Sequence, residues 1–178
     1  SGHALAFAID PDLVPDGAID ATSPRTSTHL HGGNTAPGSD GGPLDVFRPG
    51  QKWTYHYGNT QEAAGLWYHD HALGITRLNV YAGLAGFYIV RDEFDTGLAD
   101  NPIGLPSGDQ EVAFVIQDRM FTADGQLHYP ADPQTRTSPE PSVQPEFFGD
   151  VILVNGQAWP KLDVQRRKYR FVRRSGAT

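Results

Sequence analysis

Residues 67–86 read Trp-Tyr-His-Asp-His-Ala-Leu-Gly-Ile-Thr-Arg-Leu-Asn-Val-Tyr-Ala-Gly-Leu-Ala-Gly, and the earlier residues 28–31 read Thr-His-Leu-His. Each segment contains two histidines separated by a single residue. Successive side chains of a β-strand point to opposite faces of the sheet, so each pair directs both imidazoles to one face. If the two strands are neighbours, four imidazoles converge on one patch: those of His29, His31, His69 and His71.

The doubled His-x-His pattern predicts a metal site. The chain has only seven His in 178 residues, so chance placement produces well under one such pair. Imidazole suits copper, zinc, iron and nickel, and in the absence of thiolates copper or zinc is the first expectation. A structural role for the four paired histidines stays open. The isolated His3, His56 and His128 are expected to be packing or surface residues.

The rest of the chain predicts an all-β fold. Residues 51–57 alternate, with Trp53, Tyr55 and Tyr57 on one face, as in a half-buried strand. The Asn155-Gly156 pair predicts a hairpin. Short strands with frequent turns indicate a sandwich or barrel, and no segment has the length and period of a substantial helix. Strands are expected at residues 28–31, 51–57, 65–71, 84–90, 111–117, 151–154, 159–164 and 168–172.

Composition excludes several classes of protein. There is no Cys, which rules out disulfides, iron–sulfur clusters, a thiol nucleophile and a type 1 (blue) copper site in this chain. No run of about 18 apolar residues is present, so no membrane-spanning segment is expected. Residues 1–10 lack the basic start and apolar stretch of a signal peptide, so an export signal was either removed or never present.

Charge is distributed unevenly along the chain, whose formal net charge is −7. All 21 acidic residues lie at or before Asp163, whereas residues 166–178 carry six of the 14 basic ones. The acidic majority would repel a polyanion, so no nucleic-acid partner is expected. The basic end, interrupted by apolar residues, is expected to be a strand with a solvated face.

A Pro-rich stretch divides the chain. Five prolines fall between Pro130 and Pro145, a density typical of a connector. The predicted organisation is therefore one domain over 1–130, a connector over 131–147 and the start of a second domain over 148–178.

Residues 28–33 and 67–86 closely resemble the first cupredoxin domain of multicopper oxidases, in the branch of bacterial spore-coat laccase, bilirubin oxidase and phenoxazinone synthase. Residues 151–160 and 167–171 resemble the entry into the second domain of that family. The resemblance implies a cupredoxin-like Greek-key β-sandwich or barrel, incomplete here, followed by the first strands of a second cupredoxin domain. It also implies a secreted, periplasmic or cell-surface protein.

The resemblance further implies a function. Multicopper oxidases take electrons from phenols, bilins or related donors at a type 1 copper and reduce dioxygen to water at a trinuclear copper cluster. His29 resembles a type 2 copper ligand, and His31, His69 and His71 resemble ligands of the type 3 pair. Asp40 resembles an acidic residue that assists proton delivery, although an ordinary turn aspartate before Gly explains it equally well.

The sequence also departs from the family pattern. It lacks the C-terminal His-Cys-His region and the His-x-x-His-x-His stretch that complete the copper sites. The expectation is an internal piece of an oxidase, inactive alone, whose partners are the remaining domains, a small-molecule donor and dioxygen. The alternatives are a non-catalytic copper- or zinc-binding β-module and a purely structural β-domain. Asp70 is expected to make structural hydrogen bonds, and Trp67 to pack beside the histidines.

Overall fold

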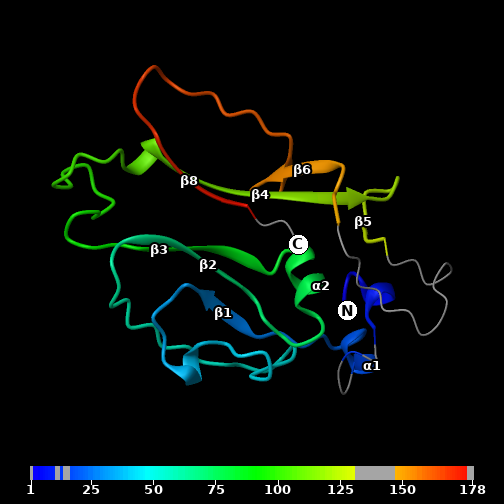
Figure 1. Ribbon diagram of the computed structural model, residues 1–178. Helices are drawn as coiled ribbons and strands as arrows, with labels where there is room; N and C mark the ends of the chain where they lie inside the picture. Colours follow the sequence, from blue (N-terminus) through cyan, green and yellow to red (C-terminus); the bar gives the residue numbers. More distant parts are fainter. Residues whose placement is uncertain (1, 11–12, 14–16, 131–146, 176–178) are drawn as a thin grey trace.

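The computed structural model describes residues 2–10, 13, 17–130 and 147–175 (Figure 1). Nearly all of the predicted connector, residues 131–146, lies outside the described residues. The described strands are β1 (Thr28–His31), β2 (Ala64–Asp70), β3 (Ala85–Val90), β4 (Glu111–Phe121), β5 (Leu127–His128), β6 (Val151–Val154), β7 (Gln157–Ala158) and β8 (Arg170–Ser175). The helical elements are α1 (Gly17–Asp20), α2 (Thr76–Tyr81) and the 3₁₀ turns η1 (Ala6–Ala8), η3 (Pro37–Ser39) and η4 (Gly108–Gln110).

The strands form two sheets that lie one over the other, as Figure 1 shows. The first is antiparallel, in the order β1-β2-β3. The second has the order β5-β4-β6-β7, with β8 pairing with β4 in parallel. This mostly-β arrangement confirms the predicted fold class. The second sheet joins β4, which precedes the Pro-rich stretch, to strands that follow it, and the domain limits remain a prediction.

Strand alternation places a small apolar cluster and three of the histidines of the first sheet on opposite faces. Leu30 and Leu66 are buried together with Val90 in a small core cluster. The neighbouring residues His29, His31 and His69 point to the other face, which the second sheet covers in part. A larger core cluster surrounds α2 and consists of Leu5, Ala8, Ala72, Ile75, Leu78, Tyr81 and Tyr129.

Two predicted strands are wrong. Residues 51–57 form no strand. Alternation of side chains predicts which face of a strand is apolar, but it does not provide a neighbouring strand for the backbone to pair with. Tyr55 instead accepts a hydrogen bond at its hydroxyl from the Thr28 backbone N–H at 3.0 Å. Residues 159–164 are also irregular. The Asn155-Gly156 turn is confirmed, but β7 stops at Ala158, since Trp159 has a φ of 38° and Pro160 cannot donate to a sheet.

The short helix α2 (Thr76–Tyr81) was not predicted either. Six residues are too few to show helical periodicity in the sequence. In the part of the chain that the structure describes, no helix has both the length and the apolar character needed to cross a bilayer.

A network of two arginines and two carboxylates ties the second sheet to the end of β3. Arg91 contacts Asp95 at 2.9 Å and Glu111 at 2.7 Å, and Arg170 contacts the same two carboxylates at 2.6 and 3.4 Å. Both carboxylate side chains are only 9% exposed. Hydrogen bonds from Arg170 and Arg91 lower the pKa of Asp95 against the opposing effect of burial, so the network holds a charged carboxylate in place.

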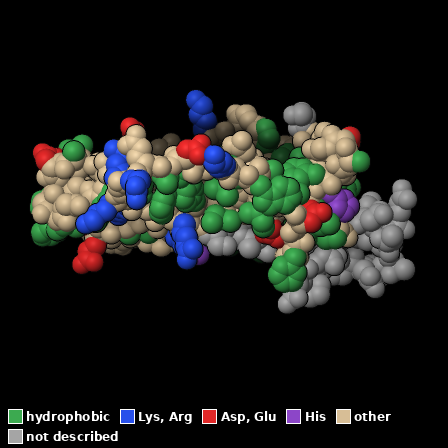
Figure 2. All heavy atoms as spheres, turned by 90° about the horizontal axis from the view of Figure 1, so that it is seen from above, with side chains coloured by type: hydrophobic (Ala, Val, Ile, Leu, Met, Phe, Trp, Pro, Cys, Tyr) green, Lys and Arg blue, Asp and Glu red, His purple; other side chains and the backbone are tan. Residues whose placement is uncertain are grey.

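The outer face of the second sheet is apolar and open to solvent. Figure 2 shows hydrophobic side chains gathered along the middle of this view, with Lys and Arg side chains beside them. A groove of about 450 Å³ runs along it. Its apolar lining includes Val112, Phe114, Ile116, Val154 and Leu162.

Candidate metal centre

The pairing of β1 with β2 brings the four predicted histidines together. His29 lies directly opposite His69 in the antiparallel register. His71 follows β2, and its backbone N–H donates to Ser27 O at 2.8 Å, which continues the strand pairing. The ring of His29 lies 5.7, 5.4 and 5.0 Å from the rings of the other three, between centroids. The predicted neighbourhood of the two His-x-His strands is confirmed.

Three of these residues also bring their donor atoms close to one another. One ring nitrogen each of His29, His31 and His69 lies within 4.8 Å of the other two. His71 adjoins this triad through ring contacts with His29 and His69, at 5.0 and 5.8 Å between centroids. His31 is exposed and His69 is buried, so the cluster opens toward solvent on one side.

Backbone carbonyls orient two of the rings. Nδ1 of His29 donates to Asp40 O at 2.6 Å, and Nδ1 of His69 donates to Asp70 O at 2.6 Å. A carbonyl oxygen can only accept, so in each ring the hydrogen is on Nδ1 and the lone pair of the neutral form is on Nε2. This is the arrangement that metal-binding imidazoles use in proteins.

The donor set fits a metal ion that imidazole binds, such as copper or zinc. In this structure Nδ1 of His31 donates a hydrogen bond to Nε2 of His69 at 3.2 Å. This separation is close to the distance of about 3.3 Å between two nitrogens that bind the same ion at about 2.0–2.1 Å with tetrahedral geometry. Nδ1 of His71 is buried and has no hydrogen-bond partner among the described residues. An unsatisfied buried donor or acceptor costs roughly 1–3 kcal/mol, which a ligated metal removes.

Electrostatics favour the neutral, metal-binding form of His69. Burial lowers the pKa of His69, the hydrogen bond with Asp70 O opposes this, and repulsion from the other three imidazoles lowers the pKa further. A neutral ring keeps its lone pair, so the metal need not displace a proton from it.

Asp40 lies next to His29, on the loop that begins directly after η3. Its Oδ1 is 3.6 Å from Nδ1 of His29 and accepts a hydrogen bond from Thr35 Oγ1 at 2.7 Å. The Asp40 side chain is 46% exposed, and that of His29 is 20% exposed. The carboxylate therefore touches both solvent and the edge of the cluster. The part it plays in proton delivery remains a prediction.

Gly41 brings this loop against β1, and sequence reasoning did not identify it. It has a φ of 71°, and a Cβ there would overlap Thr28 O and approach His29 N to 2.8 Å. Only glycine combines this backbone conformation with such close contact. The Asp-Gly pair at residues 40–41 is the one local signal that could have indicated it.

The predicted structural role of Asp70 is confirmed. Its Oδ1 accepts from the Ser27 N–H at 2.9 Å and from Thr26 Oγ1 at 2.8 Å, and its Oδ2 accepts from the Ala72 N–H at 3.1 Å. The residue is only 2% exposed. One carboxylate thus ties the entry of β1 to the segment that carries His71.

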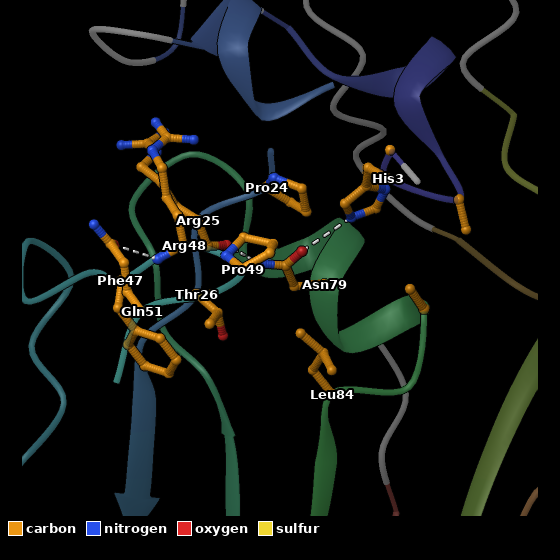
Figure 3. Close-up of a pocket in the computed structure, with 14 residues that line it drawn as sticks. His3, Pro24, Arg25, Thr26, Phe47, Arg48, Pro49, Gln51, Asn79 and Leu84 are labelled. Atoms are coloured by element: carbon orange, nitrogen blue, oxygen red, sulfur yellow. Dashed lines mark hydrogen bonds between the residues drawn. The ribbon is translucent and has the colours of Figure 1, made fainter. Parts of the chain in front are cut away.

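A separate cavity of about 350 Å³ (Figure 3) is lined by none of the four clustered histidines. His3 lines it and bonds through Nε2 to Asn79 Oδ1 at 2.9 Å, while Asn79 donates to Arg25 O at 2.8 Å. Thr26, which also lines this cavity, bonds to Asp70. His3 is thus a packing residue, as predicted.

Comparison with known proteins relates the chain to one family. The model of the multicopper oxidase family matches residues 20–95. Laccases from Bacillus stratosphericus and Bacillus subtilis (strain 168) are 44% and 46% identical over 87% and 83% of this chain. The multicopper oxidase LPR1 of Arabidopsis thaliana is 44% identical over 95%. The chain spans only 32%, 30% and 29% of the length of these relatives.

A solved multicopper oxidase structure has a fold similar to that of this chain. The multicopper oxidase McoA from Aquifex aeolicus matches with a TM-score of 0.70 and 31% identity, over 86% of this chain and 31% of that one. The fold is therefore cupredoxin-like, and these matches relate the chain to the multicopper oxidases. Within this family it is related to the bacterial laccase branch. These relationships favour the oxidase over a stand-alone metal-binding module.

Proposed function

We propose that this chain supplies half of the histidine ligands of a trinuclear copper cluster, at which a laccase-type multicopper oxidase reduces dioxygen to water. The observation that carries the proposal is the convergence of the His29, His31 and His69 donor atoms within 4.8 Å of one another. Two observations support it: the tautomers of His29 and His69 place the lone pair on Nε2, and the buried Nδ1 of His71 has no hydrogen-bond partner among the described residues.

The chain's own residues hold and orient the rings. The β1–β2 register sets the spacing of the two pairs, and the Asp40 and Asp70 carbonyls fix the His29 and His69 rings. Copper bound at this cluster supplies one-electron redox chemistry and open coordination positions for dioxygen. We assign His29 to the type 2 copper and the other three histidines to the type 3 pair, as the family resemblance implies.

Asp40 is the proposed proton donor. Reduction of dioxygen to water consumes protons, and a carboxylate in contact with both solvent and a ligand ring can deliver them. Its Oδ1 is 3.6 Å from Nδ1 of His29 and bonded to the Thr35 hydroxyl. In this role Asp40 takes a proton from water at the loop surface and releases it beside the cluster.

The remaining parts of the enzyme belong to the same proposal. The cluster's open side, at the exposed His31, is where ligands from another domain of the oxidase would complete the set. This sequence has no Cys, so the type 1 copper lies elsewhere, and we expect no turnover from these 178 residues alone. Phenol- or bilin-like donors and a location outside the cytoplasm follow from the resemblance to laccases.

A chimera tests the proposal directly. The chain replaces the matching segment of the Bacillus subtilis laccase, to which it is 46% identical over 157 residues. We expect oxygen consumption with a phenolic donor, its loss in the His31→Ala and His69→Ala chimeras, and its retention in the His56→Ala control. Slower turnover in Asp40→Asn is expected for a proton donor. Equal activity in the His69→Ala chimera contradicts the proposal.

A further inference from the structure

An indole ring lies against two of the proposed copper ligands. Trp67 pairs with His31 across the β1–β2 register and precedes His69 by two residues, so the three side chains share one face. The Trp67 ring lies 4.3 Å from the His69 ring and 5.3 Å from the His31 ring, between centroids, with interplanar angles of 30° and 34°. The indole thus contacts both of the rings whose nitrogens are 3.2 Å apart.

The second sheet contacts the indole as well. The guanidinium carbon of Arg174 on β8 lies 5.7 Å from the centroid of the Trp67 ring, and Arg174 Nη2 donates to Gly65 O at 3.3 Å. β2 and β8 lie close together at this point: a Cβ added at Gly65 would lie 2.9 Å from Val172 Cγ1.

Little free space remains beside the indole. The cavity that Trp67 and Arg174 line between the sheets measures about 10 Å³, which is about the volume needed for one water molecule. The indole therefore cannot shift toward the second sheet without moving β8.

We propose that Trp67 is a positioning residue of the metal centre, held in place by Arg174, so that the packing of β8 on the first sheet sets the orientation of the His31 and His69 rings. This inference rests on the proposed copper function. The His31 ring depends on Trp67 most, because its described contacts are to other rings, whereas His69 also bonds to a backbone carbonyl. Ligand rings held by their surroundings give a metal site a defined geometry.

Copper binding by the full chain tests this role, with Cu²⁺ alone as the probe. The variants are Trp67→Leu, Trp67→Phe and Arg174→Gln, and the matched control is Trp159→Leu, since Trp159 is 65% exposed and outside the cluster. Affinity is measured by competition with a chelator, and geometry by the electron paramagnetic resonance spectrum of bound Cu²⁺.

We expect Trp67→Leu to weaken Cu²⁺ binding by about tenfold or more, the range seen when groups that orient ligands are lost, and to change the copper hyperfine splitting. Trp67→Phe keeps a flat ring and should restore both properties. Arg174→Gln should alter the spectrum in the same direction as Trp67→Leu, by a smaller amount, and the Trp159→Leu control should match the wild type.

Wild-type affinity and spectrum in Trp67→Leu would overturn the positioning role. If circular dichroism shows that Trp67→Leu does not fold, Arg174→Gln decides, and a wild-type spectrum in that variant overturns the proposal. If the wild-type chain binds no Cu²⁺, the proposed function fails and this inference fails with it. Binding by the wild type with equal binding by Trp67→Leu removes the inference alone.

Discussion

The hydrogen bonds of the buried Asp70 carboxylate allow a quantitative prediction about the stability of the segments that carry the four histidines. It accepts hydrogen bonds from the Ser27 and Ala72 N–H groups and from the Thr26 hydroxyl. Replacing Asp70 with Ala leaves two backbone donors unsatisfied and a small cavity. Each unsatisfied buried donor costs about 1–3 kcal/mol, so the expected loss of unfolding free energy is about 3–5 kcal/mol.

The conservative Asp70→Asn variant replaces only one of the two carboxylate oxygens, so it tests the hydrogen bonds of that oxygen alone. An amide that keeps its oxygen toward Ser27 and Thr26 turns its NH₂ group toward the Ala72 N–H, so two donors face each other. One charge-assisted hydrogen bond is lost, and the expected cost is about 1.5–3 kcal/mol. Urea unfolding followed by tryptophan fluorescence measures both variants, with the exposed Asp100→Asn as the control.

A double-mutant cycle checks the cause. Thr26→Val should cost about 1 kcal/mol in the wild type and almost nothing in the Asp70→Ala background, because its acceptor is then absent. An unfolding free energy for Asp70→Ala within 1 kcal/mol of the wild type, at an unchanged urea m-value, would refute the reasoning. Additive effects of the two substitutions would show that Thr26 and Asp70 are not coupled.

Two further variants test other contacts. Gly41→Ala should destabilise the chain by more than about 2 kcal/mol, because it combines a positive φ with overlap on β1, whereas Gly38→Ala in the same loop, with nothing within 4 Å of the new Cβ, should be neutral or slightly stabilising in thermal unfolding. Asp95→Asn should cost about 2 kcal/mol at pH 7. Because folding lowers the pKa of Asp95, its ionised form stabilises the chain above the unfolded pKa of about 3.9; this contribution is lost as pH falls through the folded value.

Both predictions have clear contradicting results. Equal stability of the Gly41→Ala and Gly38→Ala variants would mean that the loop does not press on β1. Urea unfolding between pH 3 and pH 7 should show the wild-type advantage over Asp95→Asn shrinking in acid, and a constant difference across that range would contradict the ion-pair network.

Local patterns predicted the convergence of the four histidines better than they predicted the sheets. The period of two along residues 28–31 and 67–71 is enough to align each His pair, because strand geometry alone decides where alternate side chains point. The same period at residues 51–57 did not produce a strand, because a strand also needs a hydrogen-bonding partner, which alternation does not encode. The parallel pairing of β8 with β4 is non-local in the same sense and has no signature in either segment.

The parts of the site that sequence reasoning missed are backbone atoms and close approaches. The Asp40 and Asp70 carbonyls orient two rings, but a carbonyl is present at every residue and has no signature in the sequence. Gly41 is needed because β1 lies too close to it for a residue with a Cβ, and this contact is not visible in the sequence. Side-chain type and spacing thus suffice to predict which histidines lie together, whereas the orientation of their rings depends on contacts between distant segments.

Thermal unfolding of the chain with and without Cu²⁺ tests the central claim most directly. If the four histidines bind Cu²⁺, free metal at 100 times the dissociation constant should stabilise the fold by about 2.7 kcal/mol, or roughly 5–10 °C in Tm. That shift should vanish in the variant His29→Ala, His31→Ala, His69→Ala, His71→Ala and persist in His56→Ala. The same shift in the fourfold variant would place the copper elsewhere and contradict the account.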